Sequence, residues 1–395
     1  MLQLQERFGP WRARANGNEL SFRLAVLLGQ PHLIDATFRL FSAGIMPAPA
    51  RKRFLYAGID PVDLARTLRA IRSLADWPVA WAAEGRRQEA LARTAELATD
   101  PATIGAAPGY WRAAALAYGF ASAVVSADTA IGAECEAARR VAFRRAAPGL
   151  TPPAEAVTLP WRGSPLSGWL RRPRGVPGPT PLVVLFNGAG IVKEEMTRWS
   201  DEFLARGLAT LAFDGPGCGE LRGLLATDRD QEDITATILD WADAHTALDG
   251  ARVGLLGVSF GGAQVIHHTA RNLRVAACVS VTPPYDPSRY IDRVHPFVMA
   301  EIAALCDINP AAIVARASDL SCVRFVKDVH CPTLVIGAGL DAILPPTEAG
   351  KLYEALRCPK TFLYLRRATH IGLSHIDLWT EAAAEWLAAR LTIDD

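Results

Sequence analysis

The sequence of 395 residues lacks an apolar run long enough to cross a membrane as a helix. Its first residues, Met1–Arg7, carry polar and charged side chains where a signal peptide would need an apolar segment. The formal net charge is only +1, and no basic stripe with interleaved aromatic residues is present. From these absences we expect neither a membrane nor a nucleic acid as a partner.

Cysteine is scarce and shows no pattern. The seven cysteines are scattered, odd in number and without the paired spacing of metal ligands: Cys135, Cys218, Cys278, Cys306, Cys322, Cys331 and Cys358. We therefore expect a reduced, cytoplasmic protein in which most cysteines are small core residues. Nothing in the sequence requires a metal or an organic cofactor, and no internal repeat or low-complexity tract is found.

Hydrophobic residues make up 50% of the chain, and its length suits one large domain with a smaller one. Residues 1–150 show helical patterns without β-like alternation, which predicts an all-helical domain. We expect the aromatic residues of this region to pack in its core or, alternatively, to contact an aromatic or extended apolar ligand. These residues are Trp77, Trp81, Tyr110, Trp111 and Tyr118. The expected helices are Glu19–Leu28, Pro61–Leu74, Trp77–Leu97, Pro101–Val125 and Ala127–Ala146.

The pattern changes after a linker at Pro148–Pro153, where short apolar runs begin to alternate with helical stretches. This alternation predicts an α/β domain over residues 151–395 with a mostly parallel sheet covered on both faces. Residues 285–329, with helical stretches at Val298–Cys306 and Pro310–Ala317, are too long for a simple connection and are a possible cap insertion. The expected strands are an early hairpin (Ala156–Trp161 and Gly168–Arg172), Pro181–Phe186, Leu208–Phe213, Arg252–Leu256, Val275–Val281, Thr333–Gly337 and Thr361–Leu365.

The pentapeptide Gly257–Gly261 reads G-x-S-x-G, with the serine at position 259. A short apolar strand precedes it and a helical pattern follows, which is the context of a nucleophile elbow. The flanking glycines let the strand and helix backbones approach closely, so that the Ser259 hydroxyl stands clear of the sheet. We therefore predict Ser259 as a catalytic nucleophile.

A serine nucleophile needs a base, and the base needs a carboxylate to orient it. Asp341 follows the predicted strand Thr333–Gly337, and His370 follows Thr361–Leu365, so both belong at the same sheet edge as Ser259. His375 is the rival base, but it is expected to enter the last helix. His267 and His268 fit the helix behind the nucleophile, where packing is the expected role.

The oxyanion hole is expected to combine the backbone N–H of Phe260 with one from the loop after Pro181–Phe186. In that loop Gly188 and Ala189 are the candidates, because small residues let a backbone amide approach a substrate oxygen. Asp214 precedes the nucleophile within a Gly-Pro-Gly turn, so we expect it to shape the turn and not to complete the triad. Nothing near Cys218 marks it as a nucleophile.

Three motifs occur together in this chain: Lys193-Glu194-Glu195, the turn Phe213–Glu220 and the elbow Gly257–Gly262. With a helical region in front of them, the chain resembles the α/β-hydrolases related to 2,6-dihydroxypseudooxynicotine hydrolase. That group includes fungal heptaketide-shortening hydrolases and the fermentation-respiration-switch proteins. The resemblance implies an α/β-hydrolase fold, with the helical domain as a lid and a small-molecule substrate held between the two.

The resemblance further implies hydrolysis of a carbon–carbon bond next to a ketone, in a bulky, aromatic or polyketide-like metabolite. By the family pattern the triad is Ser259, Asp341 and His370. One acid of the pair Glu194 and Glu195 reaches the cavity or, alternatively, forms an ion pair at the helix start. Family relatives suggest a homodimer.

Two other readings stay open at this point. The same triad on the same scaffold would serve a carboxylesterase, a thioesterase or an acyl-transferring, lactone-forming cyclase. A non-catalytic regulator on a hydrolase fold is the alternative of another class, against which the intact triad argues. A peptidase is disfavoured because the N-terminal region shows no β-propeller repeat.

Overall fold

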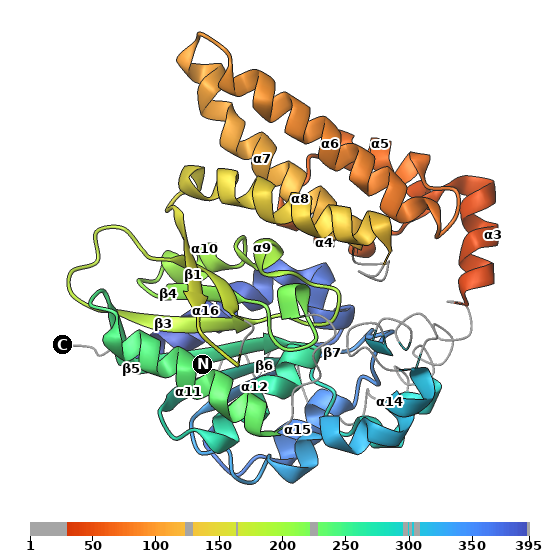
Figure 1. The fold of residues 1–395 in the computed structure, drawn as a ribbon. Helices are drawn as coiled ribbons and strands as arrows, with labels where there is room; N and C mark the ends of the chain where they lie inside the picture. Colours follow the sequence, from red (N-terminus) through yellow and green to blue (C-terminus); the bar gives the residue numbers. More distant parts are fainter. Residues whose placement is uncertain are drawn as a thin grey trace.

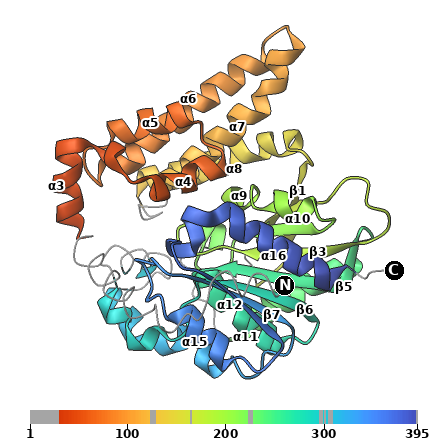
Figure 2. The same ribbon diagram turned by 180° about the vertical axis from the view of Figure 1, so that it is seen from behind.

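The computed structural model describes residues 30–122, 129–162, 165–221, 228–294, 299, 302–303 and 309–392. The predicted helix Glu19–Leu28 and most of the stretch Val298–Cys306 lie outside these residues. Within them, a layer of helices formed by the N-terminal part lies over a sheet flanked by helices (Figures 1 and 2).

The described strands form one sheet in the order β1-β2-β4-β3-β5-β6-β7-β8. The hairpin β1–β2 and the pair β2–β4 are antiparallel, and all other neighbours are parallel. This confirms the predicted mostly parallel sheet with an early hairpin. The bounds are β1 Ala154–Leu159, β2 Leu166–Arg171, β3 Thr180–Phe186, β4 Ala209–Phe213, β5 Leu248–Val258, β6 Val275–Val281, β7 Thr333–Ala338 and β8 Lys360–Leu365.

Both faces of the sheet are buried because successive side chains of a strand point to opposite sides. On β3, Val184 packs in the core formed with α11 (Asp228–Ala244), α12 (Phe260–Arg271) and α15 (Glu348–Ala355). The next residue, Leu185, packs against α10 (Ser200–Leu204) and α16 (Ile376–Leu391). Burial on two faces explains why the central strands are apolar without alternation.

Two helices of this layer, α5 and α8, begin at a side chain that accepts from the first backbone amides. Helix α5, for example, begins at Pro61 after Asp60, whose side chain accepts hydrogen bonds from the Val62 and Asp63 amides. Helices α6 and α7 form a long hairpin that projects beyond the sheet (Figure 1). The bounds are α3 Pro31–Phe41, α4 Ala48–Ala57, α5 Pro61–Ala70, α6 Asp76–Glu96, α7 Pro101–Ser122 and α8 Ala130–Ala146.

Several side chains attach this layer to the sheet region. The rings of Phe143 on α8 and Trp169 on β2 lie 4.8 Å apart. From α4, the Lys52 ammonium lies 2.5 Å from a carboxylate oxygen of Asp377, and the Tyr56 hydroxyl lies 3.2 Å from that of Thr380. The chain passes from α8 through a short 3-10 turn at Ala147–Gly149 to β1.

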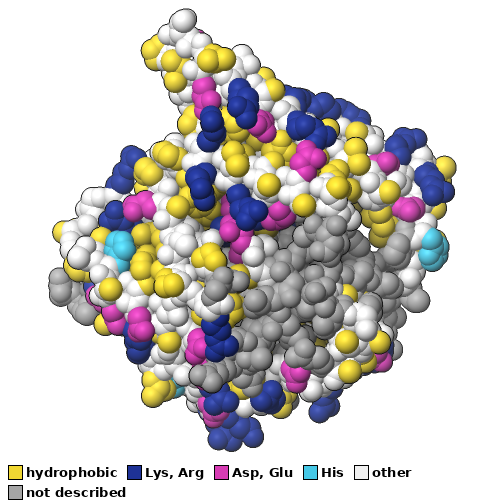
Figure 3. Space-filling view, viewed as in Figure 1, with side chains coloured by type: hydrophobic (Ala, Val, Ile, Leu, Met, Phe, Trp, Pro, Cys, Tyr) yellow, Lys and Arg dark blue, Asp and Glu magenta, His cyan; other side chains and the backbone are white. Residues whose placement is uncertain are grey.

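Between β6 and β7 the described residues form short helical turns and α14 (Pro310–Arg316). Tyr290, Ile291 and Ile313 of this segment share a small apolar cluster with Leu344, which follows β7. Among the residues that the structure describes, no helix has the length and apolar character needed to span a bilayer. On the face shown in Figure 3, acidic and basic side chains are interspersed among apolar ones.

Candidate active site

Ser259 occupies the sharp turn between β5 and α12, with φ 53° and ψ −118°. A non-glycine residue at positive φ is strained, and its neighbours must hold it in place. The Ser259 amide donates to the carbonyl oxygen of Val281, at 2.8 Å. A Cβ on Gly257 would lie 2.1 Å from the carbonyl oxygen of Gly261, so only glycine fits at position 257.

The structure brings Ser259, His370 and Asp341 together in one hydrogen-bonded chain. His370 Nε2 lies 2.9 Å from Ser259 Oγ, and His370 Nδ1 lies 2.7 Å from Asp341 Oδ2. The Asp341 side chain is buried and the His370 side chain is mostly buried, at 3% and 16% exposed. These three residues come from the ends of β5, β7 and β8, as the order of the motifs in the sequence led us to expect.

Backbone groups fix the two loops that carry the acid and the histidine. Asp341 Oδ1 accepts from the amides of Ile343 and Leu344, both at 2.9 Å, and this leaves Oδ2 directed at the imidazole. The amide of Ile371 donates to the Thr282 hydroxyl at 3.2 Å. The rival His375 instead has its Nδ1 at 2.8 Å from the Ser374 hydroxyl, at the start of α16.

The predicted oxyanion loop passes directly beside Ser259. A Cβ on Gly188 would lie 3.1 Å from the Cβ of Ser259, so a larger residue would crowd the serine. Ala189 lines the cavity in front of Ser259. Phe260 lines it too and is the first residue of α12, where a backbone N–H has no partner within the helix.

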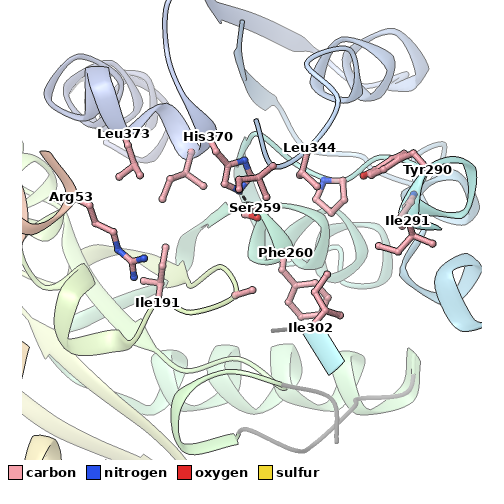
Figure 4. A pocket seen from close by; sticks show the side chains of 15 residues that line it. Arg53, Ile191, Ser259, Phe260, Tyr290, Ile291, Ile302, Leu344, His370 and Leu373 are labelled. Carbon is pink, nitrogen blue, oxygen red and sulfur yellow. Dashed lines mark hydrogen bonds between the residues drawn. The ribbon is translucent and has the colours of Figure 1, made fainter. Parts of the chain in front are cut away.

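A cavity of about 270 Å³ opens over the Ser259 hydroxyl. Figure 4 shows Ser259 and His370 near its centre, with Arg53 on one side and Tyr290 and Ile291 on the other. Its described lining is mostly apolar, and this volume lies near the lower end for pockets that hold drug-sized molecules, ~300 Å³. The other lining residues are Ala189, Ile191, Phe260, Pro284, Pro287, Ile302, Ile343, Leu344, Ile371 and Leu373.

Two polar groups on the cavity wall were not predicted from the sequence. Arg53 belongs to α4, and its guanidinium forms a two-pronged ion pair with Glu195, with Nε and Nη2 each 2.9 Å from a carboxylate oxygen. Tyr290 is buried, and its hydroxyl has no hydrogen-bond partner among the described residues. Burial raises the pKa of Tyr290 well above its usual range.

Behind the oxyanion loop lies a buried cluster of charges. The Lys193 ammonium lies 2.7 Å from Asp214 Oδ2, and Asp214 Oδ1 accepts from the side-chain amide of Asn187 at 2.9 Å. Glu194 is paired with Lys193 and with Arg139 of α8, at 3.3 Å each. Burial alone would raise the pKa of Glu194, but the charges of Lys193 and Arg139 lower it to about 2.

Asp214 therefore connects the loops around Ser259, which is the turn-shaping position that its Gly-Pro-Gly context indicated. Its carboxylate also accepts from the backbone amides of Lys193 and Glu220, at 2.9 and 3.2 Å. The opposing charges of Asp214 and Glu194 hold the pKa of Lys193 above its usual value despite burial. Asp341, and not Asp214, is the carboxylate that is hydrogen-bonded to His370 among the described residues.

None of the four residues proposed as substrate contacts lies among the described residues that line this cavity. Glu194 and Glu195 are both engaged in ion pairs with the helical layer. Trp111 is buried inside that layer, where its indole nitrogen donates to Glu96 at 2.6 Å. Tyr110 is partly exposed on the same helix. Glu195 contributes to the cavity indirectly, because it positions Arg53.

The remaining histidines of α12 have packing contacts. The His267 ring stacks on Phe325 with centroids 4.0 Å apart, and His268 Nδ1 lies 2.5 Å from the Thr235 hydroxyl. Within the described part of the chain, no three His, Cys, Asp or Glu side chains are grouped as metal ligands.

Comparison with known proteins agrees with this fold. The profile of the alpha/beta hydrolase family matches residues 183–390. The 2,6-dihydropseudooxynicotine hydrolase of Paenarthrobacter nicotinovorans is 38% identical over 138 residues, 35% of this chain and 37% of that protein. The hydrolyase ccsE of Aspergillus clavatus is 29% identical over 255 residues, 58% of each chain.

Among solved structures, that of 2,6-dihydroxy-pseudo-oxynicotine hydrolase superposes with a TM-score of 0.76 at 24% identity, covering 86% of this chain and 95% of that one. This likeness shows the shared fold, including the helical region in front of the sheet. The two sequence matches span 37% and 58% of those relatives' lengths. The resemblance seen in the sequence motifs is confirmed: the chain belongs to the alpha/beta hydrolase family.

Proposed function

We propose that Ser259 is the nucleophile of this hydrolase, His370 its general base and Asp341 the group that orients the base. The observation that carries this proposal is the continuous hydrogen-bond chain from Asp341 through His370 to Ser259 at the wall of the cavity. An imidazole that is bonded to a carboxylate at Nδ1 presents Nε2 as a proton acceptor to the serine hydroxyl.

The proposed reaction is hydrolysis of a carbon–carbon bond next to a ketone. The resemblance to hydrolases such as those of Paenarthrobacter nicotinovorans and Aspergillus clavatus supports this class. The apolar cavity supports it as well, because expulsion of a carbanion requires a site from which water is kept away while the substrate is held in line.

In the first half of the reaction, Ser259 Oγ attacks the ketone carbon while His370 Nε2 takes the serine proton. The tetrahedral oxyanion is bound by the backbone N–H groups of Phe260 and of Gly188 or Ala189. The carbon–carbon bond then breaks, and its electron pair leaves on a carbon that a neighbouring carbonyl or electron-rich ring stabilises. His370 returns its proton to that carbon, which releases a shortened ketone, or an arene where a ring carried the charge, and leaves an acyl-enzyme.

In the second half, water attacks the acyl carbon and gives a proton to His370. The bond to Ser259 Oγ breaks, the serine recovers its proton from His370, and a carboxylic acid is released. No metal or organic cofactor enters these steps. Esters, thioesters and lactones would be cleaved by the same steps with better leaving groups.

The test is mass-resolved product analysis on a panel of aryl β-diketones, aryl esters, thioesters and lactones. The wild type is compared with Ser259→Ala and with His375→Gln, a matched histidine change outside the cavity lining. We expect a carboxylic acid plus a shortened ketone from a diketone, lost in Ser259→Ala and kept in His375→Gln. Cleavage of esters or thioesters alone would replace the carbon–carbon assignment, and turnover unaffected by Ser259→Ala would contradict the proposed nucleophile.

A further inference from the structure

Tyr290 is a buried phenol at the wall of the catalytic cavity, and its hydroxyl has no hydrogen-bond partner among the described residues. Only 4% of the residue is exposed, so bulk water does not replace the missing partner. A hydroxyl buried without a partner is destabilising, and native proteins rarely keep one unless it has a function. A phenylalanine would fill the same space without this cost.

The hydroxyl is directed toward the middle of the cavity. Figure 4 shows the oxygen at the end of the Tyr290 ring that faces Leu344, with Ser259 beyond it near the centre. The neighbouring lining residues Pro287, Ile291 and Leu344 are apolar. Their side chains cannot accept a hydrogen bond, whereas a substrate in the cavity can.

Hydrogen bonds hold the turn that carries this phenol. The Asp286 amide donates to the buried carboxylate of Glu348 at 2.8 Å, and the Asp286 carboxylate accepts from the Ser321 hydroxyl at 3.2 Å. The Tyr290 amide donates to the carbonyl oxygen of Pro287 at 3.1 Å. A donor whose backbone is fixed in this way loses little conformational freedom when it binds an acceptor.

The charges around the phenol determine which acceptor suits it. Burial is the main cause of the raised pKa of Tyr290, and the carboxylates of Glu348 and Asp341 add to the rise. The hydroxyl therefore keeps its proton at neutral pH and can act as a donor. The same carboxylates disfavour a further negative charge, so that a neutral oxygen suits this position better than an anion.

We propose that Tyr290 is a specificity-determining residue whose hydroxyl donates a hydrogen bond to a neutral oxygen of the substrate, while the scissile carbonyl lies at Ser259. This inference rests on the proposed function, because Ser259 marks the position of the scissile carbonyl. The substrate class is then an acyl compound with an apolar body and a second, uncharged carbonyl or ether oxygen. A diketone, the substrate type of the proposed reaction, carries such an oxygen.

The experiment uses p-nitrophenyl esters whose acyl chains, made in several lengths, end in a methyl ketone, an isopropyl group of the same shape or a carboxylate. The wild type is compared with Tyr290→Phe, which removes only the hydroxyl oxygen. The matched control is Tyr285→Phe, which removes a phenol hydroxyl from the same segment but outside the described cavity lining. Thermal unfolding of each variant checks the fold.

At the chain length for which the wild type most prefers the ketone, we expect Tyr290→Phe to lower kcat/KM for the ketone ester about 3- to 10-fold, mainly through KM. The isopropyl ester should be cleaved as well as by the wild type or better, because no unpaired hydroxyl then faces it. The carboxylate ester should be a poorer substrate of the wild type than the ketone ester. Tyr285→Phe should change each value by less than about 2-fold.

A ketone-to-isopropyl ratio of kcat/KM that is the same in Tyr290→Phe and wild type at every chain length would overturn the proposal, and would leave an ordered water as the partner of the hydroxyl. An equal decrease for all three esters, or a wild-type preference for the carboxylate ester, would overturn it as well. These outcomes leave the proposed nucleophile untouched, provided that Ser259→Ala abolishes hydrolysis of every ester. Hydrolysis that persists in Ser259→Ala would instead contradict the proposed function itself, so the two failures are distinguished.

Discussion

Replacing Arg139 by methionine removes one of two buried cations from the charge cluster behind the oxyanion loop. The Arg139 side chain is completely buried, with Nη2 at 2.7 Å from Glu136 and Nε at 3.3 Å from Glu194. Once it is gone, Lys193 faces the carboxylates of Glu194 and Asp214, with Glu136 and Glu220 at the edge of the cluster. We expect the free energy of unfolding to fall substantially.

The magnitude follows from the ionisation of Glu194. Its pKa is lowered from the usual 4.5 to about 2, which corresponds to roughly 3 kcal/mol of stabilisation at neutral pH. Removing one partner of a buried ion pair typically destabilises by about 3–5 kcal/mol. Because Lys193 still pairs with Glu194, we expect a loss of about 3 kcal/mol for Arg139→Met at neutral pH.

The pH dependence has a definite sign. A carboxyl group with a lowered pKa in the folded state stabilises the fold above its unfolded pKa, and this stabilisation is lost as the pH falls through the folded value. The wild type should therefore lose stability between about pH 4.5 and pH 2 from this group. In Arg139→Met the pKa of Glu194 rises, so the difference between variant and wild type should shrink in that window.

Urea unfolding followed by tryptophan fluorescence, at neutral and acidic pH, measures both quantities. The matched control is Arg140→Met, because Arg140 is half-exposed and lies 3.8 Å from Glu220, a pair from which we expect at most about 1 kcal/mol. The double variant Arg139→Met with Glu194→Gln should recover part of the loss. It also removes the buried carboxylate whose charge Arg139 had balanced. Equal stability of the Arg139 and Arg140 variants would refute the argument.

Three further outcomes are expected. Asp341→Asn should lower kcat roughly 10⁴-fold with little change in the fold, because His370 loses the acceptor that sets its tautomer. Steady-state kinetics test the rate and circular dichroism tests the fold. A near-normal kcat would mean that Asp341 does not belong to the proposed triad. Gly257→Ala should destabilise the fold by about 3 kcal/mol or prevent folding, since the added Cβ would lie 2.1 Å from a carbonyl oxygen. Thermal unfolding measures this, and a midpoint like that of the wild type would contradict the steric argument. Tyr290→Phe should leave the free energy of unfolding unchanged or raise it, because the hydroxyl has no partner among the described residues. A decrease of more than about 1 kcal/mol, measured by urea unfolding, would mean that the hydroxyl is hydrogen-bonded in solution.

The parts of the fold predicted from sequence are those set by local pattern. The apolar runs that became β3, β6 and β7 were placed to within a residue at each end, because strands buried on two faces have a distinct composition. The grouping of Ser259, Asp341 and His370 followed from chain order and from the rule that parallel strands end at one sheet edge. These inferences need no knowledge of how the layers pack.

The parts that were missed depend on that packing. Arg53 lies in a helix with two neighbouring cations, Arg51 and Lys52, and nothing local distinguishes the one that meets the cavity. Aromatic content pointed to Tyr110 and Trp111, yet their segment of α7 belongs to the part of the helical layer that does not line the cavity. Motif reasoning found Glu194 and Glu195 but could not supply their partners, which are distant in sequence.

The ion pairs of Glu194 and Glu195 also bear on whether the region from β1 onward can be produced without the helical layer. Glu194 and Glu195, next to each other on α9 (Lys193–Met196), each bind an arginine of the helical layer. A fragment that began at β1 would keep Ser259, Asp341 and His370. It would leave Glu195 without Arg53, and Glu194 with one cation instead of two. The ion pairs of α9 therefore join the two layers, and we expect a fragment that begins at β1 to be less stable than the full chain.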